Sequence, residues 1–291
     1  MKKSVFTKIT ALLSAILILL SLSSCGYKMP DEITLKDEIT DSNILRIMSY
    51  NIRCLEYNKR KNIVPTLIKE YAPDSLGIQE CTYQWYQNLT KKLPEYEFIG
   101  VGRDSGDLSS GCGEISAILY NKDKYTLVDS GTFWVSETPD EVSYGWDAAC
   151  RRVCTWAILE DKSTGEQYAH VNTHLDHQGP EARTNGSKMV RDFALSFDMP
   201  VVVTGDFNFR KDTDLYNGML ETGLEDVWAV AKDTMDGKTY HDYKGGEEGL
   251  PIDFIFVNEK VEDVLKYKIV RDTYNGTYSS DHYPIYTDIT F

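Results

Sequence analysis

The sequence predicts an α/β protein built around a large β-sheet core. Nine short runs rich in β-branched and aromatic residues recur between residues 45 and 291. Three longer amphipathic patterns with helical spacing lie among them. Many strands with a few interspersed helices are typical of helices layered against sheets. The stretch is long enough for one large domain, and we find no internal repeat and no second linker in it.

The individual elements follow from local composition. The run "VVVTGDFNF" (201–209) begins with three valines, which favour a strand, and then ends in Gly, Asp and Asn, which do not. Pro65 suits the first turn of a helix, and "ARTNGSKMVRDFALSF" carries an apolar stripe at helical spacing. The predicted helices are 65–72, 82–93 and 181–197, and the predicted strands are 45–50, 75–79, 96–102, 115–120, 152–159, 168–174, 200–206, 252–257 and 283–291.

The amino terminus has the pattern of an export signal. A basic start, "MKKSVFTK", precedes the apolar run "ALLSAILILLSL", which is too short to span a bilayer as a mature helix. The run ends in "LSSC", which resembles the lipobox of bacterial lipoproteins and places the lipid on Cys25. The alternative is a plain secretory peptide with a chance cysteine. We therefore expect a signal peptide at 1–24, a lipid-anchored flexible tether at 25–43, and one domain at 44–291, outside the cytoplasm.

The charge and the cysteines limit the partners. The net charge is −14, and loss of residues 1–24 removes three lysines and no acid, which leaves a mature chain near −17. An acidic surface opposes binding to extended nucleic acid, whose affinity comes largely from Lys and Arg. After Cys25 five cysteines remain, and none has zinc-type CxxC spacing. Cys54 and Cys81 each follow a predicted strand, so a disulfide between them is one expectation. We expect a monomer.

Polar residues that suit chemistry occur repeatedly at strand ends. Each of them alone has an ordinary explanation as a turn residue, a helix cap or a buried histidine. Six apolar runs that all end in Asn, Asp, Glu or His together indicate a functional site. These residues are Asn51, Glu80, His174, Asp206 with Asn208, Asp253, and Asp281 with His282.

The motifs that hold these residues resemble one superfamily. In chain order they are "YNIR", "QE", "THL", "GDFN", "IDFIF" and "SDH", and together they resemble the endonuclease/exonuclease/phosphatase superfamily. The segments "GTFWVSETPD", "GWDAACRRVCTWA" and "NTHLDHQG" are similar to a bacterial, often secreted subgroup. This resemblance implies a four-layer α/β sandwich of two packed mixed β-sheets flanked by helices. It also implies a site where strand ends of both sheets meet.

The resemblance assigns the metal and water-activating roles. It makes Glu80 the principal metal ligand, supported by Asn51, with Asp281 on the metal side of the site. Hard oxygen ligands suit Mg²⁺, and Mn²⁺ could replace it. Asp206 would orient or deprotonate the attacking water, and Asn208 would hold a phosphate oxygen.

Other side chains would bind the phosphate. His282 would hydrogen-bond it, oriented by Asp253. His174 would be a second phosphate ligand or the acid for the leaving group, and the sequence leaves both open. For Arg152 the subgroup resemblance favours a planar phosphate clamp, and the alternative is an exposed arginine at a strand edge.

Four further residues have weaker assignments. Trp146 could stack on a sugar or base, or be a buried aromatic. If the strand continues beyond His174, alternation puts Asp176 on the same face as that histidine and His177 on the other. His170, inside a strand, is predicted to be structural.

These expectations define a function and two alternatives. The predicted function is metal-dependent hydrolysis of a phosphodiester or phosphomonoester in a small or lipid-linked substrate outside the cytoplasm. One alternative is a secreted nuclease, which the acidic charge weakens. The other is a catalytically inactive surface binding protein, which the full set of motif residues weakens. The expected partners are the phosphate ester and, through Cys25, the membrane.

Overall fold

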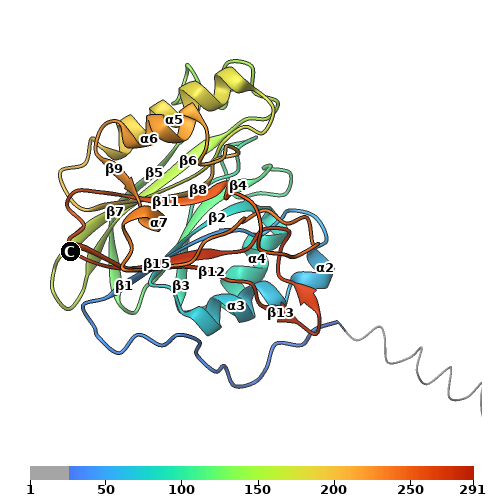
Figure 1. The fold of residues 1–291 in the computed structure, drawn as a ribbon. Helices are drawn as coiled ribbons and strands as arrows, with labels where there is room; N and C mark the ends of the chain where they lie inside the picture. The colour runs from blue at the N-terminus through green and yellow to red at the C-terminus, as the bar shows by residue number, and fades with distance from the viewer. Residues whose placement is uncertain (1–25) are drawn as a thin grey trace, which may run out of the picture.

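A computed structural model describes residues 26–291, and it is a four-layer α/β sandwich, as the sequence predicts (Figure 1). The predicted signal peptide and Cys25 lie outside the described residues. The first sheet has the order β10 (Asp233–Thr234), β12 (Asp263–Ile269), β15 (Ile285–Thr290), β1 (Leu45–Asn51), β2 (Ser75–Cys81), β4 (Ile115–Asn121) and β3 (Tyr96–Ile99). The second has the order β5 (Tyr125–Trp134), β6 (Val153–Asp161), β7 (Gln167–His174), β8 (Val201–Asp206), β11 (Asp253–Asn258) and β9 (Leu224–Asp226).

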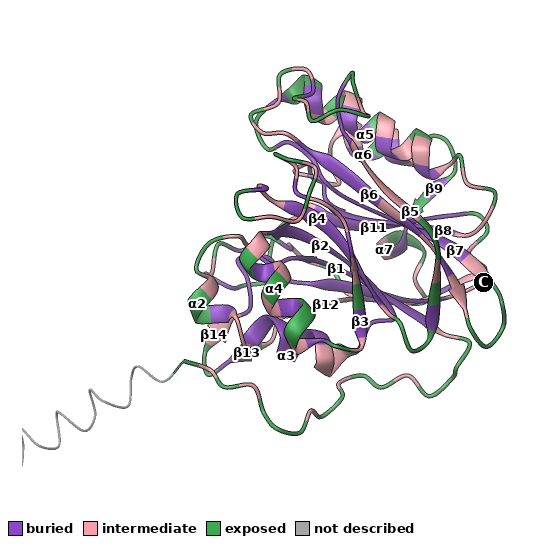
Figure 2. Ribbon diagram, turned by 180° about the vertical axis from the view of Figure 1, so that it is seen from behind, coloured by how far each residue is buried: buried purple, intermediate pink, exposed green. Residues whose placement is uncertain are grey.

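Helices cover the outer faces of both sheets. The first sheet is covered by α2 (Tyr57–Arg60), α3 (Ile63–Tyr71) and α4 (Tyr83–Lys92), and the second by α5 (Pro180–Ala194) and α6 (Asp214–Leu220) (Figure 1). The short helix α7 (Val227–Val230) contacts β11 and β12, and β13 (Thr273–Tyr274) pairs with β14 (Thr277–Tyr278) as a separate hairpin. Three apolar clusters fill the three spaces between layers, so the central strands are buried on both faces (Figure 2). Within residues 26–291, no helix has the length and apolar character needed to cross a membrane.

The nine predicted strands and three predicted helices all occur in the structure, with ends shifted by a few residues. The strands β5 and β12 were not predicted. β5 lies at the edge of the second sheet, β12 has only the two-residue β10 outside it, and both leave many side chains partly exposed. Strands at such positions lack the continuous apolar run that marks a buried strand.

Strand register brings the polar strand ends together. β7 and β8 are parallel with His174 opposite Asp206, and β11 is antiparallel to β8 with Asp253 opposite the same Asp206. In the first sheet β1 and β2 are parallel, with Asn51 opposite Gln79 and next to Glu80. Parallel strands such as β7 and β8 end at the same edge of their sheet, and the antiparallel strand β11 begins at that edge. Both sheets therefore present their polar strand-end residues at one edge of the sandwich.

A polar layer joins the two sheets beneath this edge. His170 is fully buried, with its two ring nitrogens 2.8 Å from Ser75 Oγ and 2.9 Å from Thr204 Oγ1, so it is structural, as predicted. Gln79 Nε2 donates to Asn172 Oδ1 at 2.7 Å across the same space. These contacts satisfy polar groups that would otherwise be costly to bury.

Gly77 allows the sheets to approach this closely, and its replacement by alanine is expected to lower the free energy of unfolding. A Cβ at this position would lie 2.0 Å from Thr204 Oγ1 and 2.4 Å from Asn172 Oδ1, so the sheets would have to separate. Overpacking of this kind costs about 1–3 kcal/mol. The matched control is Gly218→Ala in α6, where a Cβ meets open space. Chemical denaturation should show a loss for the first variant only; equal stability of Gly77→Ala and the parent would contradict the close packing.

Residues 26–43 contain no helix or strand, and their contacts differ from those of a free linker. Lys36 donates from its backbone N–H to Glu70 and from Nζ to Asp272, each near 2.8 Å, and Asp37 pairs with Lys266 at 2.7 Å. The segment therefore lies along the outside of the first sheet and its helices (Figure 1). Charged side chains of the domain bind it there, which composition alone does not reveal.

The five described cysteines are Cys54, Cys81, Cys112, Cys150 and Cys154, and all are unpaired. The expected disulfide between Cys54 and Cys81 is therefore wrong. Cys81 is buried in the apolar cluster between the first sheet and its helices, whereas Cys54 lines the cavity at the edge of the sheets. The two side chains therefore lie in separate environments.

Candidate active site

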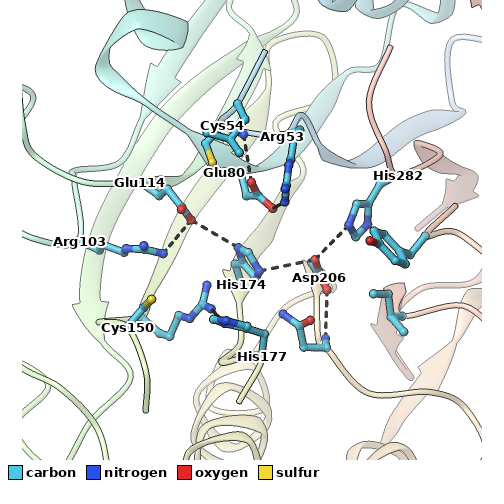
Figure 3. Close-up of a pocket in the computed structure, with 15 residues that line it drawn as sticks. Arg53, Cys54, Glu80, Arg103, Glu114, Cys150, His174, His177, Asp206 and His282 are labelled. Carbon is cyan, nitrogen blue, oxygen red and sulfur yellow. Dashed lines mark hydrogen bonds and ion pairs between the residues drawn. The ribbon is translucent and has the colours of Figure 1, made fainter. Parts of the chain in front are cut away.

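A cavity of about 490 Å³ lies at the edge where the polar strand ends meet. Its lining includes three arginines, three histidines and three acidic residues (Figure 3). Of the residues assigned from the sequence, six line it directly: Glu80, Arg152, His174, Asp206, Asn208 and His282.

Glu80 reaches the cavity because β2 carries a β-bulge. The register with β4 shifts between Ile78 and Cys81, and Glu80 has a left-handed φ of 57°. A non-glycine residue in this region is uncommon, and such backbone strain often occurs at functional sites. Burial tends to raise the pKa of Glu80, but hydrogen bonds from the Cys54 N–H (3.0 Å) and Asn51 (3.1 Å) outweigh it and lower that pKa. Glu80 is therefore an ionised, hard oxygen donor at the cavity wall.

Asn51 links the two sheets at this point. Its Nδ2 donates to Glu80 Oε1 at 3.1 Å and to Asp206 Oδ2 at 3.0 Å. Asp281 is also buried, and Arg53 lies between it and Glu80, with nitrogens 3.4 Å and 3.6 Å from the two carboxylates. The three residues assigned to the metal by resemblance thus form one connected group, in which Arg53 supplies positive charge.

Asp206 occupies the centre of the site. It is 2% exposed, and burial, followed by repulsion from Asp253, raises its pKa above that of an ordinary aspartate. Its Oδ1 accepts the N–H of Asn208 at 3.0 Å. Asn208 has a φ of 52°, and its amide donates to Leu175 O, which leaves its second N–H for the cavity. Asp206 and Asn208 of the "GDFN" turn therefore both direct polar side-chain atoms into the cavity.

His282 forms a buried triad with two aspartates. Its Nδ1–H donates to Asp253 Oδ2 at 2.9 Å, and its Nε2 lies 3.8 Å from Asp206 Oδ2. Burial alone would lower the pKa of His282, but the charges of Asp253 and Asp206 raise it to about 10. The imidazole is therefore a cation at neutral pH, suited to holding a phosphoryl oxygen.

His174 has the opposite electrostatic environment. Its Nε2 lies 3.5 Å from Asp206 Oδ2, and its Nδ1 lies 3.8 Å from Glu114 Oε2. Burial, followed by the positive charges of Arg152 and Arg103, lowers the pKa of His174 well below the usual value. A neutral imidazole donates one hydrogen bond but is a weak proton source. This environment favours the phosphate-ligand role over the acid role that the sequence left open.

The segment after β7 differs from the alternation that the sequence predicts. β7 ends at His174, and it is His177 that lines the cavity, 3.0 Å from Arg152. Asp176 is buried behind it and accepts N–H bonds from Cys150, Gln178 and Gly179. Its Oδ2 also pairs with Arg152 at 3.3 Å. Asp176 therefore positions the arginine, because the chain turns into α5 instead of continuing as a strand.

Trp146 does not line the cavity. It is partly buried and packs against the apolar cluster between the second sheet and its helices. Of the two roles that the sequence left open, Trp146 therefore has that of a packed aromatic side chain, and it does not stack on a ligand in the cavity.

Several cavity residues were not identified from the sequence. Arg103, Glu114, Cys54 and Tyr240 all line the cavity. Glu114 immediately precedes β4, as Asp253 opens β11, so the same strand-end pattern could have identified it. Arg103 lies in a loop, and its place becomes evident only from its 2.7 Å ion pair with Glu114.

The fold and the site together define the class of protein. Two mixed sheets pack between helices, and acidic, histidine and arginine side chains gather at the edge where both sheets end. The model described as Endonuclease/Exonuclease/phosphatase family matches residues 48–282. The chain therefore belongs to the endonuclease/exonuclease/phosphatase family of phosphoester hydrolases.

Solved structures from Bacteroides support this membership. A family protein from Bacteroides vulgatus is 37% identical, with a TM-score of 0.78 over 85% of this chain and 99% of that one. A mannosyl-6-phosphatase from Bacteroides thetaiotaomicron is 31% identical, with a TM-score of 0.79 over 85% of this chain and 100% of that one. An uncharacterized protein of Acanthamoeba polyphaga mimivirus is 24% identical over 163 residues, which span 53% of this chain and 59% of that protein.

Proposed function

We propose that this protein is a divalent-metal-dependent phosphoesterase that hydrolyses a small or lipid-linked phosphate ester outside the cytoplasm. The observation that carries the proposal is the connected group Glu80–Asn51–Asp206–His282–Asp253, which crosses from one sheet to the other through hydrogen bonds and close ion pairs. Hydrolysis of a phosphate ester requires an activated water and neutralisation of the phosphoryl oxygens. This group offers a base and a cation side by side.

The donors at Glu80 fit a hard divalent cation. The carboxylate is ionised, lies at the cavity wall and is oriented by Asn51 and the Cys54 N–H. Oxygen donors of this type suit Mg²⁺, with Mn²⁺ as a substitute. Such a cation, when bound, neutralises phosphoryl oxygens and stabilises the leaving oxygen.

The side chains of the cavity divide the remaining work. Asp206 accepts a proton from the attacking water, since its raised pKa makes it a stronger base than an exposed aspartate. His282, as a cation held by Asp253, donates to one phosphoryl oxygen, and the free N–H of Asn208 donates to another. Arg152, fixed by Asp176 and His177, supplies a planar clamp on the same phosphate.

The cavity favours a compact anionic substrate. Three arginines line it within a chain whose net charge is −14, so the cavity offers cationic contacts for an anion on a protein that is acidic overall. Extended nucleic acid requires many phosphate contacts along a basic surface, which weakens the nuclease alternative. The similarity to a mannosyl-6-phosphatase favours a phosphorylated sugar among small esters.

A substrate panel tests the proposal. The purified chain is assayed with p-nitrophenyl phosphate, bis-p-nitrophenyl phosphate, mannose 6-phosphate, inositol phosphates, sphingomyelin and supercoiled plasmid, each with Mg²⁺ and with EDTA. We expect EDTA-sensitive hydrolysis of a small or lipid-linked ester and little plasmid nicking. Efficient nicking with no small-ester hydrolysis would favour the nuclease, and no hydrolysis of any ester would favour the binding protein.

The lipoprotein proposal has its own test. Replacement of Cys25 by serine removes the thiol that lipidation requires, so the protein should leave the membrane fraction or remain unprocessed. Metabolic labelling with a fatty acid, followed by fractionation, measures both outcomes. A labelled band of unchanged intensity in Cys25→Ser cells would overturn the lipid anchor.

A further inference from the structure

One nitrogen in the cavity lacks a partner. His174 Nδ1 is buried and makes no hydrogen bond within residues 26–291, and Glu114 Oε2 faces it at 3.8 Å. The side chain is 91% buried, and its other nitrogen, Nε2, lies 3.5 Å from Asp206 Oδ2. With its proton on Nε2, the imidazole directs the lone pair of Nδ1 at the Glu114 carboxylate. Nδ1 and the Glu114 carboxylate are then two donors that face each other, and Arg103 is the cation within hydrogen-bond distance of that carboxylate.

Two more donors lie next to Glu114. The carboxylates of Glu80 and Glu114 and the thiol of Cys54 each offer one atom within 4.8 Å of the others. Figure 3 shows Cys54, Glu80 and Glu114 above His174, with their functional groups directed into the cavity. Arg103 bonds Glu114 through Oε2, so the second carboxylate oxygen accepts no side-chain hydrogen bond in the described residues.

We propose that Cys54, Glu80, Glu114 and His174 bind a thiophilic divalent cation such as Zn²⁺. One sulfur, one imidazole nitrogen and two carboxylate oxygens form a four-donor set of the kinds that Zn²⁺ uses. The sulfur and imidazole donors favour Zn²⁺ over Mg²⁺ at this site, because Mg²⁺ prefers sites made only of oxygen donors. The site shares Glu80 with the proposed Mg²⁺ ligand and lies on the Cys54 and Glu114 side of that carboxylate.

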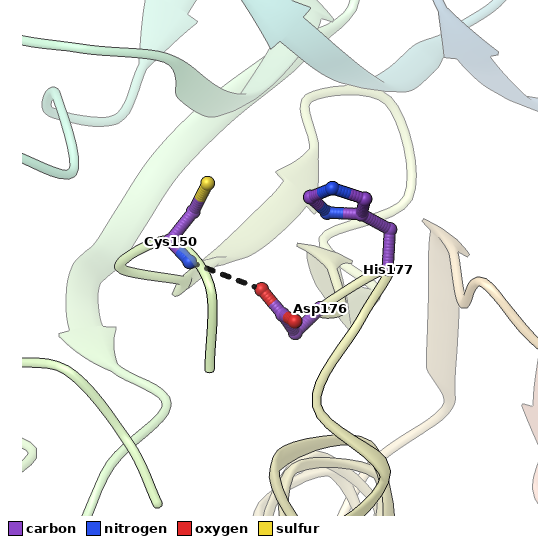
Figure 4. A group of neighbouring side chains, drawn as sticks. All are labelled: Cys150, Asp176 and His177. Carbon is purple, nitrogen blue, oxygen red and sulfur yellow. Dashed lines mark hydrogen bonds between the residues drawn. The ribbon is translucent and has the colours of Figure 1, made fainter. Parts of the chain in front are cut away.

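A second cluster in the cavity is a weaker candidate. Cys150, Asp176 and His177 also bring ligand atoms within 4.8 Å of one another (Figure 4). However, three backbone N–H groups already bond Asp176, and the Arg152 guanidinium contacts both Asp176 and His177. Both carboxylate oxygens of Asp176 and both ring nitrogens of His177 therefore already have partners, whereas His174 Nδ1 has none in the described residues. The two clusters each contain one cavity cysteine, which makes them separable by experiment.

Cobalt(II) is a suitable probe, because it binds where Zn²⁺ binds and gives a charge-transfer absorption band when a thiolate is a ligand. The full chain, kept reduced with a phosphine, is titrated with Co²⁺ and then with Zn²⁺. We expect a thiolate band that saturates at equimolar Co²⁺ and disappears when Zn²⁺ is added. The readout is independent of hydrolysis, so it stands even if the proposed function fails.

Variants assign the band to a site. Cys54→Ser should abolish it, with Cys54→Ala as a second variant if the serine protein misfolds, and Cys150→Ser is the matched control that should keep it. Glu114→Gln should weaken Co²⁺ binding by at least about tenfold, because even groups that only orient a ligand contribute that much. Absence of a thiolate band in the parent overturns the proposal. So does a band that survives Cys54→Ser or is lost in Cys150→Ser.

Discussion

Replacement of Asp206 by asparagine is expected to reduce kcat by roughly a hundredfold to ten-thousandfold, the usual range for loss of a general base. The change keeps the size of the side chain and one oxygen for the Asn208 N–H, which Asp206 accepts at 3.0 Å. It removes the charge and the proton-accepting group. KM should change much less, because His282, Arg152 and Asn208 still contact the phosphate. Steady-state kinetics at saturating substrate and Mg²⁺ measure the separation of kcat from KM.

The control for this prediction is Asn208→Ala. That variant removes a phosphate contact but leaves the base, so it should weaken transition-state stabilisation and retain more activity than Asp206→Asn. Thermal unfolding of both variants excludes a general loss of structure. If Asp206→Asn turned over within a few-fold of the parent, Asp206 would be an ordinary turn residue.

Replacement of Glu80 by alanine is expected to lower metal-dependent hydrolysis by about a hundredfold or more, since a metal ion contributes several kcal/mol of charge stabilisation. The side chain lies at the cavity wall and fills no apolar core, so the fold should persist. Isothermal titration with Mg²⁺ and the rate at limiting Mg²⁺ measure the effect. The matched control, Glu225→Ala, removes an exposed glutamate on the edge strand β9 and should change neither quantity. Full activity of Glu80→Ala at limiting Mg²⁺ would show that this carboxylate is not the ligand.

Much of the fold could be predicted because buried strands are distinctive. The valines of β8 and the run "IDFIFV" are apolar on both faces, as strands between two layers must be. The strands β5 and β12 have a partly exposed face, and their mixed composition resembles that of loops. The four-layer arrangement came from the motif resemblance, because strand order depends on contacts far apart in the chain.

The site was predictable where side chains sit in regular strand register. His174, Asp206 and Asp253 lie in one row across three neighbouring strands, so their positions at strand ends, together with the motif resemblance, indicated a shared site. Residues beyond the strands were harder to place. The turn after His174 exchanges the expected directions of Asp176 and His177, since three backbone N–H groups draw the carboxylate inward.

Arg103 and Glu114 are cavity residues that the sequence did not predict. These two residues are 11 positions apart, and their ion pair of 2.7 Å forms only because the intervening loop folds back on β4. Neither residue belongs to the motifs that carry the family resemblance. Their presence at the cavity therefore depends on tertiary structure and not on a local pattern.

The most direct test of metal-dependent phosphoester hydrolysis at this cavity is one reversible measurement. Product formation from the best substrate of the panel is followed with Mg²⁺, after EDTA, and after Mg²⁺ is restored, for the parent and for Asp206→Asn. We predict that the parent loses activity with EDTA and regains it with Mg²⁺, while the folded variant stays low in all three conditions. Hydrolysis by the parent that EDTA does not reduce, or that Asp206→Asn retains in full, would contradict the account.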